Sequence, residues 1–165
     1  MKKKGVYAGS FDPITNGHMW MIREGSLLFD EFVVVIGTNP DKNYTFTTEE
    51  RFHLIEKSIK GIDNVKIDSM ENRFLVRYTE NIGANYILRG IRSENDYSFE
   101  RVMRNINGDM NSDITTVFLI PPREIAEVSS SMVKGLIGPE DWREVVKKYV
   151  PLPVYNFFLE RFDKT

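Results

Sequence analysis

The sequence predicts a doubly wound α/β fold, with one parallel five-stranded sheet, helices on both faces and further helices toward the C-terminus. Strand-like apolar runs alternate with helical patterns along the 165 residues. Such alternation implies right-handed crossovers between parallel strands. A chain of this length is expected to form one domain with a substantial core. We therefore interpret residues 1–165 as a single domain, since no repeat, linker or low-complexity segment divides them.

Each strand and helix expected in the first half of the chain is predicted by its own residue pattern. Residues 4–8 form a short apolar run typical of a strand, and residues 19–29 carry the periodic pattern of an amphipathic helix. Residues 31–37 are apolar throughout the middle of the run, as in a buried parallel strand. Thr47 and Glu50 form the pattern of a capping box, which predicts a helix from there to about residue 60.

The second half continues the alternation. The pattern predicts, in order, a weaker strand at 65–67, a helix at 72–81, a strand at 86–88, a helix at 96–110 and a strand at 115–120. Beyond residue 131 the chain is helical in pattern, with breaks at the Gly-Pro of 138–139 and the Pro-Leu-Pro of 151–153. The apolar segment 154–159 is expected to close the core rather than to join subunits.

Composition excludes several classes of function. The chain has no cysteine, which excludes disulfides, thiolate metal sites and cysteine nucleophiles. A formal net charge of -2 argues against a dedicated nucleic-acid binder. The longest apolar runs, such as 32–36, are far shorter than the ~20 residues that span a bilayer, and no signal-peptide pattern follows the basic start. The expectation is a cytoplasmic protein with neither a nucleic-acid nor a membrane partner.

The strongest functional signal lies between the first predicted strand and the first predicted helix. Residues 9–18 read Gly-Ser-Phe-Asp-Pro-Ile-Thr-Asn-Gly-His. The two glycines allow backbone N–H groups to approach an anion, and the start of the helix favours negative charge. His18, in the first helical turn, is placed to donate a hydrogen bond to a phosphoryl oxygen as charge grows there. A lone Asn-Gly-His is more often a turn with a surface histidine, so the prediction of a phosphate site depends on the whole segment.

Three further stretches, at 39–42, 88–92 and 128–134, follow predicted strands or open a helix. Each also fits an ordinary structural role, as a surface lysine, surface ion pairs and a helix N-cap. Taken together with residues 9–18, they resemble in order and spacing the nucleotidyltransferases with a Thr/His-x-Gly-His motif, and within these the phosphopantetheine adenylyltransferases. The resemblance covers about the first 140 residues. Neither a Gly-x-Gly-x-x-Gly fingerprint nor a P-loop occurs.

The resemblance implies a Rossmann-like nucleotidyltransferase fold whose first and fourth strands flank the ligand site. It implies transfer of the adenylyl group of ATP to 4'-phosphopantetheine, giving dephospho-coenzyme A and pyrophosphate by direct attack on the α-phosphate. The catalytic residues it implies are His18, Lys42 and Arg92. The residues it implies for binding the acceptor are Ser10, Lys42, Leu75 and Arg89. The residues it implies for binding ATP are Ser10, Phe11, His18, Gly90, Ile91, Arg92, Glu100, Ile125, Ala126, Glu127, Val128, Ser129, Ser130 and Ser131.

The same resemblance implies Mg²⁺ as the companion of ATP, coenzyme A as a feedback ligand and a homohexamer. The sequence displays no cage of metal ligands, so no residue is predicted to bind the metal.

Some positions depart from the usual pattern of the family. Ala8 stands where proline is common, Ile125 where an aromatic residue often lies, and Arg73 and Arg77 where small or acidic residues are usual. The predicted helix places both arginines on one face, where they either point outward toward acids such as Glu80 or reach the acceptor channel. The alternatives therefore include another adenylyl- or cytidylyltransferase, such as a nicotinate mononucleotide adenylyltransferase, and a non-catalytic nucleotide or coenzyme A sensor.

Overall fold

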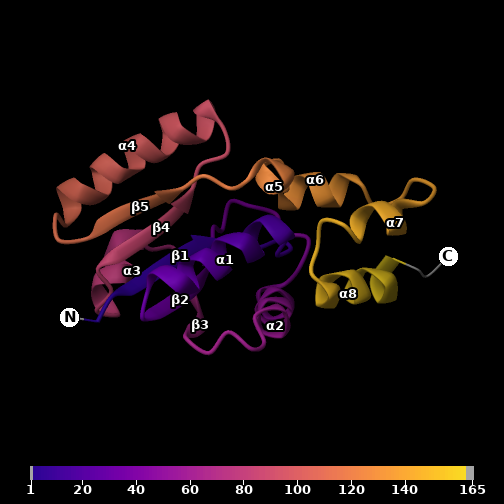
Figure 1. Cartoon of the computed structure of the whole chain (residues 1–165), viewed down its shortest axis with the longest axis horizontal. Helices are drawn as coiled ribbons and strands as arrows, with labels where there is room; N and C mark the ends of the chain where they lie inside the picture. The colour runs from indigo at the N-terminus through magenta and orange to yellow at the C-terminus, as the bar shows by residue number, and fades with distance from the viewer. Residues whose placement is uncertain (1, 163–165) are drawn as a thin grey trace.

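The computed structural model describes residues 2–162, which form a five-stranded, all-parallel sheet flanked by helices (Figure 1). The strands, in the spatial order β3-β2-β1-β4-β5, are β1 (Lys4–Gly9), β2 (Glu31–Thr38), β3 (Val65–Glu71), β4 (Tyr86–Gly90) and β5 (Thr115–Leu119). The chain passes outward from β1 through β2 and β3, then returns to the other side of β1 for β4 and β5. The order therefore reverses between β1 and β4, which confirms the predicted fold class and the predicted position of the switch point.

Eight helices connect and follow these strands within residues 2–162. They are α1 (Asn16–Leu28), α2 (Thr48–Ser58), α3 (Leu75–Asn81), α4 (Glu94–Met110), α5 (Arg123–Ala126), α6 (Ser130–Gly135), α7 (Trp142–Val146) and α8 (Leu152–Phe162). The predicted capping box is present at the start of α2, where the Thr47 side chain accepts from the Glu50 N–H and the Glu50 carboxylate accepts from the Thr47 N–H.

Two elements differ from the pattern-based prediction. β3 extends to Glu71 because it pairs with β2 in unbroken register from Val65 onward, and this pairing stabilises residues that the apolar pattern does not mark. α3 begins at Leu75 rather than at residue 72, since Asn72 has a φ of 39°, a left-handed conformation that an α-helix cannot include.

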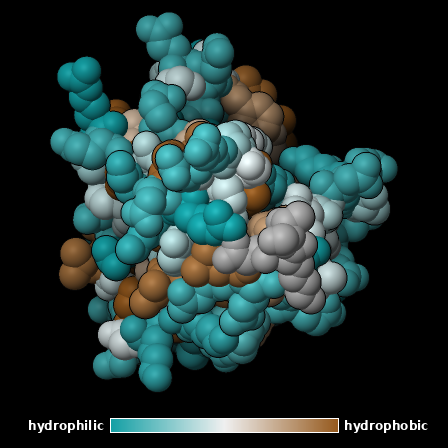
Figure 2. Space-filling view, turned by 90° about the vertical axis from the view of Figure 1, so that its right-hand side faces the viewer, coloured by the Kyte–Doolittle hydropathy of each residue, from teal (hydrophilic) through white to brown (hydrophobic). Residues whose placement is uncertain are grey.

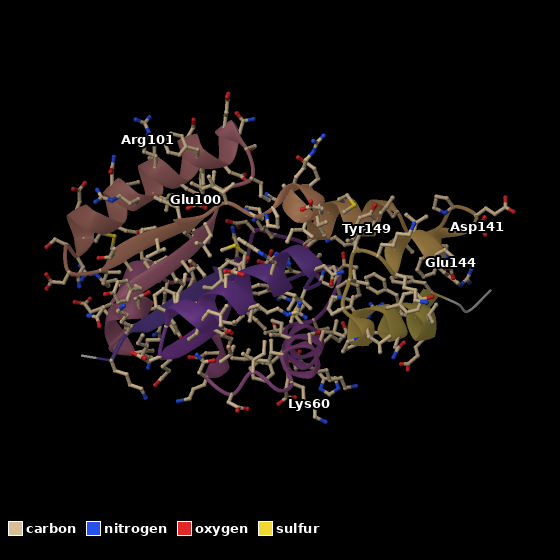
Figure 3. The ribbon with its side chains drawn as sticks, in the orientation of Figure 1. Lys60, Glu100, Arg101, Asp141, Glu144 and Tyr149 are labelled. Carbon is tan, nitrogen blue, oxygen red and sulfur yellow. The ribbon has the colours of Figure 1, made fainter. Side chains whose placement is uncertain are left out.

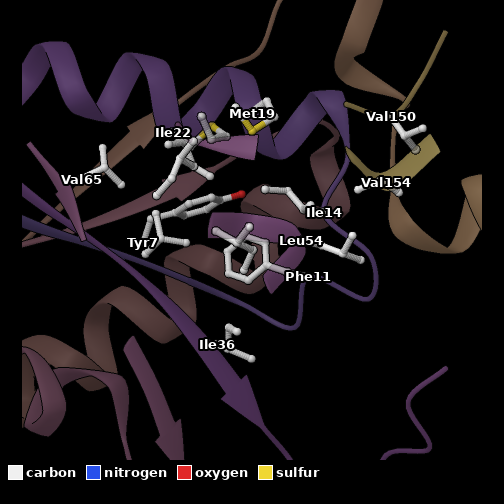
Figure 4. Packing of buried hydrophobic residues seen from close by; sticks show 14 of the residues in the cluster. Tyr7, Phe11, Ile14, Met19, Ile22, Ile36, Leu54, Val65, Val150 and Val154 are labelled. Carbon is white, nitrogen blue, oxygen red and sulfur yellow. The ribbon is translucent and has the colours of Figure 1, made fainter. Parts of the chain in front are cut away.

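The sheet buries different side chains on its two faces. On one face Tyr7, Val34 and Ile36 pack with α1, α2 and the C-terminal helices, and Figure 4 shows this cluster from close by. On the other face Val33 and Val35 pack with α3. This alternation along β2 follows from the two-residue period of a strand whose both faces are covered.

The C-terminal helices close the first face of the sheet. Val154 and Phe158 of α8 are fully buried, and the Phe158 ring stacks on Phe46, with ring centroids 5.8 Å apart. The apolar segment 154–159 therefore covers the core, as expected from the sequence. Figure 2 shows that this end of the molecule is mostly hydrophilic on its outside, with apolar residues in small groups.

Helix α4 has an unusual distribution of side chains. Its buried residues are Glu100 and Asn107, whereas the large apolar side chains Phe99, Val102 and Ile106 are exposed by 60%, 50% and 41%. Figure 3 shows Glu100 on the side of α4 that faces the sheet and the neighbouring Arg101 directed away from it. No helix within residues 2–162 is long and apolar enough to cross a membrane.

Candidate active site

A cleft opens at the carboxyl ends of β1 and β4, where the strand order reverses. Its first hollow has a volume of about 490 Å³ and lies between the β1–α1 segment, the start of α4 and residues 125–131. Its second hollow has a volume of about 380 Å³ and extends toward β3 and α3. The two hollows meet at the residues that line both of them, which are Ala8, Gly9, Ser10, Lys42, Arg89, Phe99 and Glu100. Two ligands bound side by side would touch there.

The glycines of residues 9–18 are required by close packing. A Cβ atom on Gly9 would lie 3.1 Å from the Phe11 ring, and one on Gly17 would lie 2.8 Å from the carbonyl oxygen of Val128. Neither glycine has a positive φ. Gly17 therefore allows the start of α1 to abut the segment around Val128, which brings two walls of the first hollow together beside His18.

Phe11 packs against side chains that line the first hollow. Its ring is 1% exposed and packs edge-on against the rings of His18 and Tyr7, with centroids 5.0 and 5.6 Å away. The carbonyl of Ser10 accepts a hydrogen bond of 2.8 Å from Nη1 of Arg51. In a trans peptide the N–H of Phe11 points the opposite way from that carbonyl. A contact between Phe11 and a nucleotide is therefore expected from the backbone, because the ring is buried.

His18 is held in one orientation by the first turn of α1. The N–H of the buried Thr15 donates to Nδ1 of His18 at 3.1 Å, and Oγ1 of Thr15 lies 3.0 Å from the same nitrogen. Nδ1 therefore carries no proton, and the neutral ring has its N–H at Nε2. Burial, and secondly the positive charge of Arg92, lower the pKa of His18 to about 4. At neutral pH His18 is thus an uncharged hydrogen-bond donor on the wall of the first hollow.

Lys42 is the most available cation at the junction of the two hollows. It belongs to a tight turn in which its own N–H donates to the carbonyl of Asn39 at 3.0 Å. Its side chain is exposed, and the hydrogen bonds and ion pairs found within residues 2–162 do not include its ammonium group. An unpaired ammonium beside a cavity is suited to binding an anion.

The two arginines at the end of β4 and just beyond it, Arg89 and Arg92, already have acidic partners. Arg89 donates to the buried Glu100 from Nε at 2.9 Å and also from Nη2, and its Nη1 donates to the carbonyl of Ala8 at 3.0 Å. Arg92 donates from Nε to Asp96 at 3.0 Å and is more exposed. Arg89 is therefore fixed between β1 and α4, whereas Arg92 is held only by a partner on the rim of the first hollow.

The predicted serine run lies at the start of α6. Ser129 accepts from the N–H of Met132 at 3.2 Å as the helix N-cap, and Ser130 donates to the carbonyl of Pro13 at 2.7 Å. Ser131 is exposed and lines the first hollow together with Ser129 and Ser130. The run thus joins the far wall of the cleft to the β1–α1 segment while one hydroxyl remains available.

The structure brings most of the predicted site residues to the cleft. Those that line it are Ser10, His18, Lys42, Leu75, Arg89, Gly90, Arg92, Glu100, Ile125, Val128, Ser129, Ser130 and Ser131. Phe11 is buried, and the wall residues of the two hollows do not include Ile91, Ala126 or Glu127. The N–H of Ile91 instead bonds to the carbonyl of Leu119 at 2.9 Å, which ties it to β5. The roles of all these residues in ligand binding stay predictions.

The prediction that Arg73 and Arg77 share a helix face is wrong. Arg73 precedes α3 and lines the second hollow. Arg77 lies within α3 and pairs with Glu80 at 3.0 Å on the surface, so it follows the outward-pointing alternative. The N-cap residue Phe74, which is extended with a ψ of 131°, separates Arg73 from the helix that carries Arg77.

The sequence analysis missed two buried charges beside the site. Asp12 accepts from the N–H groups of Thr45 and Phe46 at 3.0 and 2.9 Å and from Lys134 at 2.7 Å. Burial alone would raise the pKa of Asp12, but these donors outweigh it and hold the pKa below its ordinary value. Arg51, in the first half of α2, is 1% exposed. Apolar periodicity cannot reveal such residues, because charged side chains are expected on the surface.

The cleft offers no dedicated metal cage. Within residues 2–162 no three of the side chains that commonly bind metals lie close enough to share an ion. The two acidic side chains that line the first hollow, Asp96 and Glu100, are paired with Arg92 and Arg89. This donor set fits a Mg²⁺ ion whose ligands are mostly nucleotide phosphates and water, the usual arrangement for Mg²⁺ with a triphosphate.

Comparison with known proteins identifies the family. Residues 6–136 match the cytidylyltransferase-like family. A phosphopantetheine adenylyltransferase of Chromobacterium violaceum is 56% identical over 98% of this chain and 99% of its own length. One of Lacticaseibacillus casei is 38% identical over 93% and 90%.

Among solved structures, one similar protein has the same fold as this chain. The nicotinic acid mononucleotide adenylyltransferase of Plasmodium falciparum, complexed with NaAD, superposes with a TM-score of 0.71 over 99% of this chain and 97% of its own. Its sequence is only 18% identical, so this likeness concerns the fold alone. The near full-length identity to the bacterial relatives goes further: this chain belongs to the phosphopantetheine adenylyltransferase family.

Proposed function

We propose that the protein transfers the adenylyl group of ATP to 4'-phosphopantetheine, giving dephospho-coenzyme A and pyrophosphate, a step of coenzyme A biosynthesis. The names of the full-length relatives support this reaction. The observation that carries it is the pair of hollows that meet at Ser10 and Lys42, with the neutral His18 on the wall of the first. Two substrates in these hollows would bring their phosphates together at that junction.

The reaction requires positioning more than proton transfer. An oxygen of the acceptor phosphate forms a bond to the α-phosphorus of ATP, and the bond from that phosphorus to the oxygen bridging the α- and β-phosphates breaks. The electron pair leaves with pyrophosphate. A phosphate monoester is already an adequate nucleophile, so no general base is needed. Lys42 and the hydroxyl of Ser10 are the groups that would orient the acceptor phosphate.

His18 would stabilise charge on the α-phosphoryl oxygens through its Nε2–H. A neutral donor fixed by Thr15 needs no reorganisation as that charge develops, and this is where such a hydrogen bond contributes most to the rate. Arg92, on the same hollow, would interact with the phosphates of ATP beside Asp96. Arg89 lines both hollows and has N–H groups left beyond those bound by Glu100 and Ala8, which would be free to bind the acceptor.

The second hollow suits the pantetheine arm. Its walls include the apolar side chains of Met70, Leu75 and Met103 together with the amide of Asn107. A long arm of methylene and amide groups needs both kinds of contact. Mg²⁺, bound with ATP, would neutralise charge on the leaving pyrophosphate.

We also propose that the protein is a homo-oligomer, a hexamer by family resemblance. The stripe of Val102 and Ile106 on α4 supports this, because a second copy would bury side chains that one copy leaves exposed and that do not line the cleft. Regulation by coenzyme A and a cytoplasmic location stay predictions.

Pyrophosphate release tests the reaction directly. ATP and CTP should each be offered with 4'-phosphopantetheine and with nicotinate mononucleotide. Turnover is expected only with ATP and 4'-phosphopantetheine. Turnover with another pair would assign a different transferase, and tight nucleotide binding without any turnover would identify a sensor.

A further inference from the structure

Arg51 is a fully buried cation whose contacts are all with uncharged groups. Its Nη1 donates to the carbonyl of Ser10 at 2.8 Å, its Nε to the carbonyl of Thr47 at 3.4 Å and its Nη2 to Oγ1 of Thr48 at 3.2 Å. Its guanidinium lies over the ring of Tyr44, 4.1 Å from the centroid. The ion pairs found within residues 2–162 do not include Arg51.

These contacts connect the two loops that meet at the junction of the hollows. Ser10 follows β1, and its carbonyl is bound by Arg51. Tyr44 lies in the connection from β2 to α2, and its hydroxyl accepts the N–H of Asn39 at 2.8 Å. Asn39 in turn accepts the N–H of Lys42. A continuous path of contacts therefore runs from Ser10 through Arg51, Tyr44 and Asn39 to the turn that carries Lys42.

We propose that Arg51 and Tyr44 are positioning residues that set Ser10 and Lys42 relative to each other at the acceptor-phosphate site. This inference rests on the proposed function, since it concerns the same site. Burying a cation without a carboxylate partner costs folding free energy, so filling the space alone would be served better by an uncharged side chain. A planar guanidinium, by contrast, binds acceptors in several directions and stacks on an aromatic ring at once. A lysine would keep the charge but lose this geometry.

The clearest variant is Tyr44→Phe, which keeps the ring under Arg51 and removes only the hydroxyl that binds Asn39. We expect the KM for 4'-phosphopantetheine to rise by about three- to tenfold, the effect of losing one positioning hydrogen bond. The KM for ATP should stay within twofold, because the path does not include His18, Arg92 or Ser131, which line the first hollow and not the second. Arg51→Lys should show the same selectivity with a larger rise. Tyr155→Phe is the matched control, because Tyr155 lies in α8 and does not line the cleft.

A double-mutant cycle separates positioning from general loosening of the fold. Tyr44 acts through the turn that carries Lys42, so Tyr44→Phe should add nothing to the acceptor KM in a Lys42→Ala background. A full additional rise in that background would overturn the proposal, as would equal rises of both KM values in the single variant. Thermal unfolding of Tyr44→Phe should stay close to that of the parent. A parent that fails to use 4'-phosphopantetheine would refute the proposed function instead, which keeps the two failures distinct.

Discussion

Lowering the pH from 7 to 5 should leave His18 largely uncharged. With a pKa of about 4, roughly nine tenths of the His18 rings are neutral at pH 5, whereas an imidazole with the ordinary value of 6.5 would be about 3% neutral. The cause is the position of the ring, which is buried beside Phe11 and faces the charge of Arg92. The bond from the Thr15 N–H to Nδ1 opposes protonation further, since a protonated Nδ1 cannot accept it.

Nuclear magnetic resonance can test this on a protein with a single histidine. The chain has two histidines, so in the His53→Gln variant the remaining imidazole signals belong to His18. The C2 proton of the ligand-free variant should titrate with a midpoint about two units below 6.5, and the ¹⁵N shifts at pH 7 should show the proton on Nε2. A midpoint near 6.5, or a proton on Nδ1, would refute the role of His18 as a fixed neutral donor.

The same shift has a consequence for folding. Between pH 6.5 and about 4 the unfolded chain binds a proton at His18 that the folded protein does not bind. The free energy of unfolding should therefore fall as the pH decreases through this window. Urea unfolding of His18→Gln should lack this contribution, and an unchanged pH dependence would contradict the lowered pKa.

Three further changes test the structure. Asp12→Asn should lower the free energy of unfolding at pH 7 by about 2 kcal/mol. Because the folded pKa of Asp12 is lowered, its contribution is present above pH 4 and lost as the pH falls further, so urea unfolding at pH 3 should show a smaller difference. Arg73→Ala should raise the KM for the acceptor by about three- to tenfold, because Arg73 lines the second hollow. Arg77→Ala is the matched control and should leave this KM unchanged. If the two variants have the same acceptor KM, Arg73 does not belong to the acceptor site. Val102→Glu should reduce the assembly size in sedimentation velocity, and an unchanged size would exclude the α4 stripe as an interface.

The sequence by itself determined the fold class, and it predicted a phosphate-binding segment at residues 9–18. The family resemblance supplied the position of the switch point. The fold class and the segment depend on local information. Strand and helix periods identify the elements, and the carboxyl ends of parallel strands meet at one edge of a sheet. Residues at or shortly after the carboxyl ends of β1, β2 and β4, such as Ser10, Lys42 and Arg89, are therefore expected to converge, and this expectation needs no knowledge of the packing.

Only the tertiary structure decided how the site is held together. Asp12 and Lys134 are 122 residues apart in the sequence, and Arg51 binds a carbonyl 41 residues away. α4 turns Glu100 toward Arg89 and leaves apolar side chains outside, which reverses the usual helix pattern. Phe11 is taken from the cleft into the core by its packing against Tyr7 and His18. For Asp12 and Arg51 a partner far away in the sequence stabilises the buried charge, and a local pattern carries no information about such partners.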